Sequence, residues 1–372
     1  MKAKPFAGLL ILAAVAGAVF FLQQRGEAPS GEPGTTTTSK EAHTGPLTTV
    51  SCFVGGEKSR YLANPEVKRI LAERYGLKID AVKAGSIEMV TTLPVDGKSC
   101  LWPSNQVATE LYAQRATTRP AVAQETVFNS PIVFYTWDVV ADAFEAEGLI
   151  EARDGVWYLS DLPALIDHLQ NGTAWKDVGL PQLFGKMKVA STDPRKSNSG
   201  NMFSGLLANM MNGGEVVSGD QVEAVLKKLK AYFDRMGYME SSSGDIFENF
   251  LKTGVGAKPI IVGYENQLIE LAIEHAEYQD LLRQKIRTLY PVPTVWSSHP
   301  IIALDDKGKQ LIAAFEDEDL QDIAWRGHGF RSGLLGVEND PSALPVIGLP
   351  LAVESVMPMP SAAAMGRIID GL

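Results

Sequence analysis

The sequence predicts an α/β protein with two lobes. At 372 residues the chain is too long for one average domain and suits two of ordinary size. Its first folded stretch alternates: a β-rich run at 48–54, an amphipathic helix at 67–75 and a second strand at 77–82 follow one another. Strand, helix and strand at these lengths are typical of a parallel βαβ unit. A hydrophobic content of 45% with 21% charged residues is normal for a globular protein and excludes wholesale disorder.

Residues 1–25 have the pattern of an export signal. Lys2 and Lys4 precede a run of 17 apolar residues at 6–22. That length is at the lower limit for a membrane-spanning helix, and we expect an uncleaved transmembrane anchor, with a cleaved signal peptide as the alternative. Because the lysines stay on the cytoplasmic side, the rest of the chain would be periplasmic or otherwise extracytoplasmic, tethered to the inner membrane. Residues 26–46, rich in Gly, Pro, Ser and Thr, predict a disordered linker.

The remaining elements follow from hydrophobic spacing and turn residues. Helices are predicted where apolar side chains recur at intervals of three and four, and strands where β-branched and aromatic residues gather. After residue 82 we expect helices at 106–115, 139–147, 162–170, 202–210, 221–236, 246–251, 267–275, 319–326 and 362–369, and strands at 130–137, 259–266 and 288–304. The proline-rich stretch at 341–360 fits no element.

The balance of charge limits the class of partner. A net charge of −10 argues against nucleic acid, because no basic stripe is available to neutralise phosphates. An acidic total does not exclude a local anion site, since a buried helix end acts over a short distance and is little affected by distant charges.

Residues 188–211 predict such an anion site. The run reads as a strand end, a turn at Asp193-Pro194, and a helix that Ser197 or Ser199 can cap. The start of a helix presents unpaired backbone N–H groups and a positive dipole end, and Ser197, Ser199 and Gly200 allow a ligand to approach closely. An ordinary capped helix is the alternative interpretation of this stretch.

Cysteines, histidines and catalytic motifs favour binding over chemistry. Cys52 and Cys100 are the two cysteines of a chain with an export signal, which predicts one disulfide, with two buried free thiols as the alternative. The five histidines have no paired ligand spacing, so we expect no metal centre and no other cofactor. Nucleophile, phosphate-loop, zinc and dinucleotide motifs are absent from the sequence, and we expect a protein that is not an enzyme.

Small polar residues mark turns next to strands and helices along the chain. These turns are Gly55-Gly56, Gly85-Ser86, residues 197–200 and residues 241–243, with Tyr264-Glu265 at the end of a strand. Together with the export signal, they resemble the type II periplasmic solute-binding proteins of ABC transporters, within them the branch of molybdate, sulfate and phosphate binders. The likeness covers about residues 47–330, and residues 84–86, 192–200 and 263–265 carry it best.

The resemblance implies a two-lobed fold, with two mixed sheets and flanking helices joined by two crossing strands. Lobe one would be residues 47–130 and 290–372, lobe two residues 131–289, with crossings near 132–137 and 289–295. The ligand would lie between the lobes, held by hydroxyls and backbone N–H groups. The residues expected to bind it are Gly56, Gly85, Ser86, Thr192, Ser197, Ser199, Gly200 and Tyr264.

Two features of these turns affect the expected ligand. Gly56 departs from the resemblance, because anion binders of this kind often have a serine in the first turn. Five cations lie near the turns and could supply charge, although solvated surface roles are the expectation for long basic side chains. They are Lys58, Arg60, Arg195, Lys196 and Arg331.

The sequence thus predicts an exported, monomeric protein that clamps a small, anionic solute for ABC-type uptake by a membrane permease. One alternative is a membrane-tethered envelope sensor or assembly factor with the same fold. Another is a hydrolase on the same frame, which would require an ionisable pair in the cleft.

Overall fold

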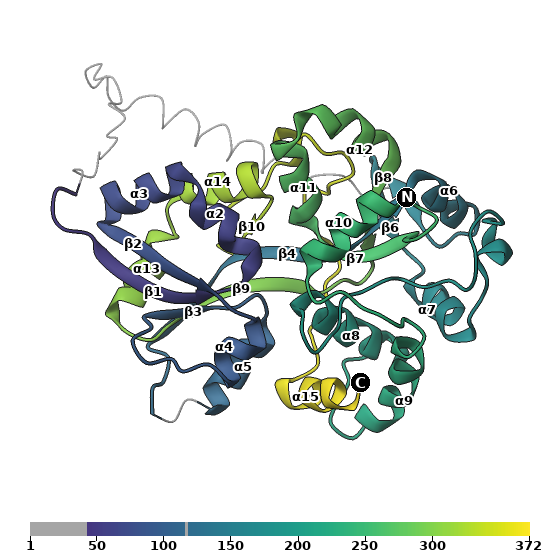
Figure 1. The fold of residues 1–372 in the computed structure, drawn as a ribbon, viewed down its shortest axis with the longest axis horizontal. Helices are drawn as coiled ribbons and strands as arrows, with labels where there is room; N and C mark the ends of the chain where they lie inside the picture. Colours follow the sequence, from purple (N-terminus) through teal and green to yellow (C-terminus); the bar gives the residue numbers. More distant parts are fainter. Residues whose placement is uncertain (1–42, 116–117) are drawn as a thin grey trace, which may run out of the picture. The chain divides into compact units, whose positions relative to one another are not determined.

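A computed structural model describes residues 43–115 and 118–372 (Figure 1). The expected anchor at 6–22 and nearly all of the linker lie outside these residues. Within the described part of the chain, every helix is too short or too polar to cross a bilayer. The described residues form one compact unit.

The first sheet is mixed, and it contains the parallel βαβ unit that the sequence predicts. β1 (Thr48–Val54) pairs in parallel with β2 (Leu77–Lys83) and with β3 (Cys100–Trp102). β9 (Trp296–Ala303) continues the sheet antiparallel to β3, and the first half of β4 (Ala123–Trp137) then pairs with β9 and with β10 (Arg331–Ser332). The helical segments of this part are η1 (Gly56–Lys58), α2 (Ser59–Ala63), α3 (Pro65–Tyr75), α4 (Ser86–Thr91), α5 (Gln106–Arg115), α13 (Asp306–Ala314) and α14 (Glu318–His328).

The second sheet is built on the other half of β4. There β4 pairs antiparallel with β7 (Ile260–Tyr264) and β8 (Ile286–Pro291), and β8 pairs in parallel with β6 (Val156–Leu159), which pairs with β5 (Glu151–Arg153). Its helical segments are α6 (Asp138–Ala146), α7 (Leu162–Asn171), η2 (Trp175–Val178), α8 (Asn198–Met211), α9 (Val222–Phe233), α10 (Ser243–Thr253), α11 (Glu265–Glu274), η3 (Ala276–Tyr278) and α12 (Gln279–Lys285).

Two segments run between the sheets. β4 belongs to both, and the short link between β8 and β9 runs beside it (Figure 1). The Ile132 N–H donates to the Val295 carbonyl at 3.0 Å, and the Thr294 hydroxyl donates to the Ile132 carbonyl at 2.6 Å. These bonds hold the two connecting segments side by side at the junction between the lobes.

Each sheet has its own core. Val50, Trp102, Phe128 and Phe330 belong to a cluster on the first sheet, whereas Phe134, Phe203 and Leu289 belong to a larger cluster on the second. Burying separate apolar faces on two sheets gives the two-lobed α/β fold that the sequence predicts.

The predicted disulfide is present in the structure. Cys52 on β1 and Cys100 on β3 are paired in register, with Cα atoms 4.7 Å apart, and their sulfurs are bonded. The bridge closes a segment with a sequence separation of 48, which contributes about 4 kcal/mol on a chain-entropy argument.

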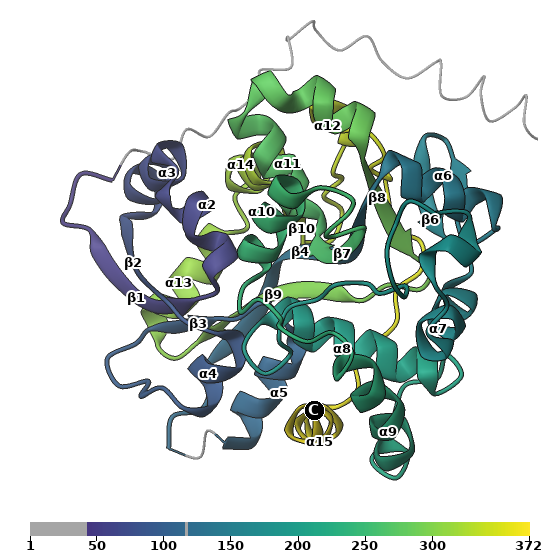
Figure 2. The same ribbon diagram turned by 45° about the vertical axis from the view of Figure 1, so that its right-hand side comes forward.

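The C-terminal helix α15 (Ala362–Gly371) contacts helices that pack on both sheets. After β10 the chain continues through a segment in which Val356 pairs with Thr294, and α15 then packs against α8, α9 and α5 (Figure 2). Met365 and Ile368 of α15 belong to the same apolar cluster as Val107 of α5.

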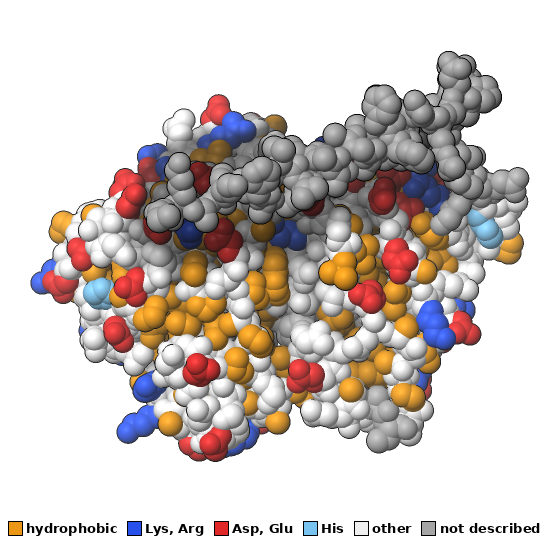
Figure 3. Space-filling model, turned by 180° about the vertical axis from the view of Figure 1, so that it is seen from behind, with side chains coloured by type: hydrophobic (Ala, Val, Ile, Leu, Met, Phe, Trp, Pro, Cys, Tyr) orange, Lys and Arg blue, Asp and Glu red, His pale blue; other side chains and the backbone are white. Residues whose placement is uncertain are grey.

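Charged side chains of both signs are interspersed over the surface seen from behind (Figure 3). Basic side chains on this face lie among acidic ones.

Candidate functional site

The start of α8 gathers four of the residues expected to bind ligand. Ser197 precedes the helix with extended backbone, and its hydroxyl lies 3.1 Å from that of Ser199. The Ser199 hydroxyl is also 2.8 Å from that of Thr192. Gly200 lets this turn pack closely, because a Cβ there would be 2.3 Å from the Thr192 carbonyl oxygen. The result is a cluster of three hydroxyls at a helix N-terminus, where backbone N–H groups lack intrahelical partners.

A second turn, on the first sheet, contributes Gly85 and Ser86 at the start of α4. The Ser86 hydroxyl is buried and accepts a hydrogen bond from the Ser104 N–H at 2.9 Å. Ser104 lies two residues after the end of β3, and Ser86 lies three residues after the end of β2. Both strands run parallel to β1, which lies between them, so their carboxyl ends are at the same edge of the sheet. The carbonyl of Ser104 in turn accepts from the Ser297 hydroxyl at 2.8 Å.

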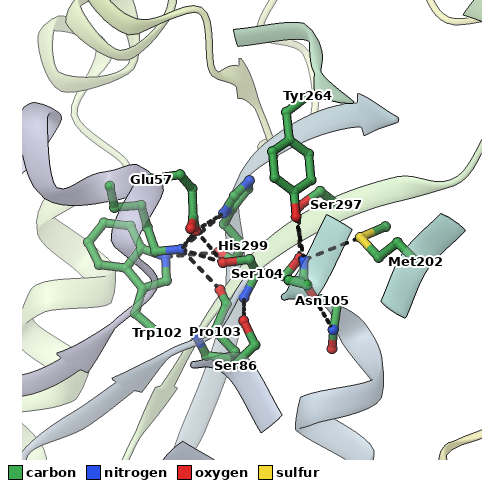
Figure 4. Close-up of polar contacts among 12 residues, drawn as sticks. Glu57, Ser86, Trp102, Pro103, Ser104, Asn105, Met202, Tyr264, Ser297 and His299 are labelled. Atoms are coloured by element: carbon green, nitrogen blue, oxygen red, sulfur yellow. Dashed lines mark hydrogen bonds and ion pairs between the residues drawn. The ribbon is translucent and has the colours of Figure 1, made fainter. Parts of the chain in front are cut away.

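The Asn198 side chain links Tyr264 on the second lobe to Ser104 on the first, and Figure 4 shows the polar contacts around Tyr264 and Ser104. The Asn198 amide at the first residue of α8 donates to the Tyr264 hydroxyl and to the Ser104 carbonyl, both at 3.0 Å. Asn105 donates to the Asn198 side-chain oxygen. Ser86, Ser199 and Tyr264, distant in the sequence, are therefore linked through Ser104 and Asn198.

Tyr264 is protonated at neutral pH. Burial raises the pKa of Tyr264, as does the charge of Glu57, while hydrogen bonds with Asn198, Ser199 and Ser297 partly offset this rise. The same groups place the Tyr264 hydroxyl between the hydroxyl cluster of α8 and the first sheet.

Gly56 is the expected ligand residue that the structure does not bring into these contacts. A Cβ at Gly56 would be 2.4 Å from Cε of Lys83. The Lys83 side chain therefore covers the space where a side chain at residue 56 would lie. Its neighbour Glu57 reaches the site instead.

Three charged or titratable side chains that the sequence analysis did not assign to the site lie beside it. Lys58 is fully buried, and its ammonium donates to Glu57 at 2.5 Å, to the Ser104 hydroxyl at 3.0 Å and to His299 Nδ1 at 3.0 Å. The prediction that Lys58 is a solvated surface residue is therefore wrong: its side chain is buried and its charge is paired with Glu57. The position of the Glu57-Lys58 dipeptide, just after the glycine turn of β1, was the available signal.

The cluster holds one negative and one positive charge at neutral pH. Burial alone would raise the pKa of Glu57, but Lys58 and His299 hold it well below its usual range. Burial lowers the pKa of Lys58, and Glu57 opposes this. Burial and the Lys58 charge lower the pKa of His299 to about 4, despite Glu57, so the imidazole is neutral. With Nδ1 accepting from Lys58, the proton lies on Nε2, which is buried and has no partner among the described residues.

A buried ion pair lies next to Tyr264. Arg331 on β10 donates to both carboxylate oxygens of Glu265 at 2.6 and 2.8 Å, and the Tyr290 hydroxyl donates to Glu265 at 2.5 Å. Arg331 is 5% exposed, which corrects its expected surface role: it joins the first sheet to the start of α11. The side chains of Arg60, Arg195 and Lys196 are 58, 55 and 65% exposed, as expected.

The site offers hydroxyls, amides and one paired ammonium. Over residues 43–115 and 118–372, no group of three or more His, Cys, Asp or Glu side chains is arranged to hold a metal ion. This set of groups can hold a small acceptor-rich molecule by hydrogen bonds.

The arrangement of the sheets and helices matches solved structures. The iron-bound HitA of Pseudomonas aeruginosa aligns with a TM-score of 0.59 and 14% identity, covering 88% of this chain and 99% of that one. A substrate-binding protein of an ABC transporter from Agrobacterium tumefaciens gives 0.52 and 14%, covering 80% and 83%. The sulfate-binding protein SubI of Mycobacterium tuberculosis gives 0.50 and 14%, covering 87% and 96%.

The chain has the fold of type II solute-binding proteins. At these identities the likeness establishes the fold, and it confirms the two-lobed architecture predicted from the sequence. No family model matches the chain, and no curated protein matches it in sequence.

Proposed function

We propose that this chain is an exported substrate-binding protein that clamps a small anion between its two lobes for ABC-type uptake. The observation that carries the proposal is the linkage of Ser86 and Ser104 on one lobe to Asn198, Ser199 and Tyr264 on the other. Hydrogen-bond donors from two lobes around one spot suit a ligand bound by closure of a hinge.

The choice of an anion follows from the groups at that spot. Hydroxyls, a side-chain amide, the N-terminus of α8 and the Lys58 ammonium are donors, and oxyanions are acceptors. SubI is described as sulfate-binding and the Agrobacterium protein as part of an ABC transporter, which supports the same class of role here. Binding of this kind needs no catalytic step.

The proposed location and assembly rest on the N-terminal sequence and on the disulfide. The apolar run at 6–22 would tether the protein to the inner membrane, and Cys52–Cys100 suits an oxidising, extracytoplasmic space. We propose a monomer with lobes at 47–130 plus 290–372 and 131–289, amended so that α15 moves with the second lobe. Its contacts with α8 and α9 support that amendment.

A ligand-dependent shift in melting temperature tests the proposal. The full-length chain would be heated with sulfate, molybdate, phosphate, ferric citrate, sugars and amino acids in turn. An anion at 100 times its Kd should add about 2.7 kcal/mol to the stability of the folded state. The shift should shrink in Ser199→Ala and Tyr264→Phe and persist in Ser218→Ala, whose hydroxyl bonds only to nearby groups on the surface. If no anion raises the melting temperature of the wild type, the proposal fails.

An envelope sensor or assembly factor is the second candidate. Two direct bonds across the lobes favour it, because they close the lobes without a ligand: Asn105 donates to Asn198, and Asn198 donates to the Ser104 carbonyl. Purification of the full chain from membranes discriminates between the roles: a transporter permease in the purified material supports uptake, and a different envelope complex supports the second role.

A further inference from the structure

The Glu57 carboxylate lies among the groups that an oxyanion would use. The Ser104 hydroxyl donates to Glu57 Oε1, and the Lys58 ammonium donates to the same oxygen at 2.5 Å. His299 Nδ1 is 3.4 Å from it. Burial raises the pKa of Tyr264 on the second lobe, and the charge of the Glu57 carboxylate raises it further. Figure 4 shows the Glu57 carboxylate beside His299 and Ser104.

The local chain is built to accept this carboxylate. A Cβ on residue 55 would be 2.4 Å from both Glu57 Oε1 and the Ser104 hydroxyl, so only glycine leaves room for the contact. Behind it, Lys58 is fixed by the Pro103 carbonyl at 3.3 Å and by Ser104. The Glu57 carboxylate is therefore surrounded by the Lys58 ammonium, the Ser104 hydroxyl and the backbone of Gly55, all held in place by other contacts.

The two ends of this ion pair differ in their access to solvent. The Lys58 side chain is 0% exposed, whereas that of Glu57 is 19% exposed. The Lys58 side chain cannot reach solvent unless the core opens, whereas the Glu57 side chain can rotate toward solvent. A carboxylate that leaves would expose the ammonium and the Ser104 hydroxyl to a ligand.

We propose that Glu57 is a resident anion that determines specificity: an oxyanion ligand enters only by displacing it from Lys58 and Ser104. This inference rests on the proposed function. Two anions in one space repel each other, and a single ammonium cannot neutralise both. With Glu57 in place, the site thus binds free oxyanions weakly and selects those that compensate for the displacement of Glu57 by contacts with the second lobe.

Titration calorimetry on the full chain tests the proposal with sulfate, molybdate and phosphate. Glu57→Gln should bind at least one of them about tenfold or more tighter than the wild type does, because the repulsion is gone and Lys58 is unpaired. The double variant Glu57→Gln, Lys58→Met should lose the gain. Glu145→Gln, which removes the same charge from an exposed position on α6, should bind as the wild type does.

The outcomes separate this inference from the function on which it rests. Equal or weaker anion binding by Glu57→Gln, with measurable binding by the wild type, would overturn the role of Glu57 and leave the function standing. If neither protein binds any of the anions, the anion-binding function itself fails. Ferric citrate is titrated in the same way: if the wild type binds it and Glu57→Gln loses that affinity, the carboxylate is a ligand for a cation and the inference is wrong.

A crystal structure of the wild type in saturating sulfate tests the same point should Glu57→Gln not fold. Sulfate bonded to Ser104 and Lys58, with Glu57 turned outward, is the expected result. Sulfate bound between the lobes beside an unmoved Glu57 would contradict the proposal.

Discussion

His299 illustrates how one buried residue links the site to the stability of the fold. Its ring is 1% exposed and packs edge-on against Phe330, and Nδ1 accepts from Lys58. Protonation of this ring would place a second positive charge beside Lys58. The folded state therefore holds the imidazole neutral, with a pKa of about 4 in place of 6.5.

The pH dependence of unfolding should report this histidine. A group with a lowered folded pKa binds more protons when unfolded, so stability falls as the pH drops below 6.5 and continues to fall until about 4. Between pH 7 and pH 5 the loss due to His299 should be about 2 kcal/mol. Glu57 does not contribute in this window, because its lowered pKa affects stability only below its unfolded value near 4.5.

Urea unfolding at a series of pH values measures this effect. His299→Gln should flatten the decline between pH 7 and pH 5, and His43→Gln, which changes an exposed histidine, should leave it as in the wild type. A decline of the same size in His299→Gln would assign the effect to other groups.

At the scale of the element, sequence spacing predicted most helices and strands because each has a local pattern. α7, α11 and α15 begin and end within a few residues of the predicted ranges. The sequence did not predict α13, whose first turn is charged and contains Gly308, or α12, which is short. β4 is longer than its predicted core at 130–137, because its first half is stabilised by pairing with the distant β9.

The candidate site was partly predictable for the same reason. Ser86, Ser199 and Tyr264 lie where a strand ends or a helix begins, and such places can be read from the sequence. The roles of Ser104, Asn105, Asn198 and His299 depend on tertiary contacts between segments far apart in the chain. The position of the Glu57-Lys58 pair, after a glycine turn at a strand end, was readable from the sequence. Its burial was not, because a dipeptide of this kind is ordinarily solvated.

The first turn of α8 gives a test of close packing at this scale. Gly200→Ala would place a methyl group 2.3 Å from the Thr192 carbonyl oxygen, so backbone must move. We expect a loss of about 1–3 kcal/mol in unfolding free energy and weaker anion binding, because Ser199 moves with the turn. Gly366→Ala in α15, where a Cβ meets nothing within 4 Å, should instead stabilise the fold by about 1 kcal/mol. Equal stability of Gly200→Ala and the wild type, measured in urea, would contradict this packing.

At the scale of the whole described unit, several independent contacts hold the lobes together. Asn198 joins α8 to the end of β3, Arg331 joins β10 to α11, and α15 touches α5 as well as α8 and α9. The Glu110 carboxylate of α5 accepts from the N–H of Ala362, at the start of α15. If the lobes open as proposed, the polar contacts at the site must break. The helix α15, which contacts α5 of one lobe and α8 and α9 of the other, would then restrain their separation.

Asn198 should therefore control the balance between closed and open forms. Asn198→Ala removes the hydrogen bonds to Ser104 and Asn105, at about 1 kcal/mol each, which would change the ratio of closed to open molecules by about tenfold or more. Small-angle X-ray scattering without ligand should give a larger radius of gyration for Asn198→Ala than for the wild type. Asn171→Ala, at the exposed end of α7, is the matched control. An unchanged radius in Asn198→Ala would mean that α15 and the Arg331–Glu265 pair hold the lobes closed without the contacts at the site.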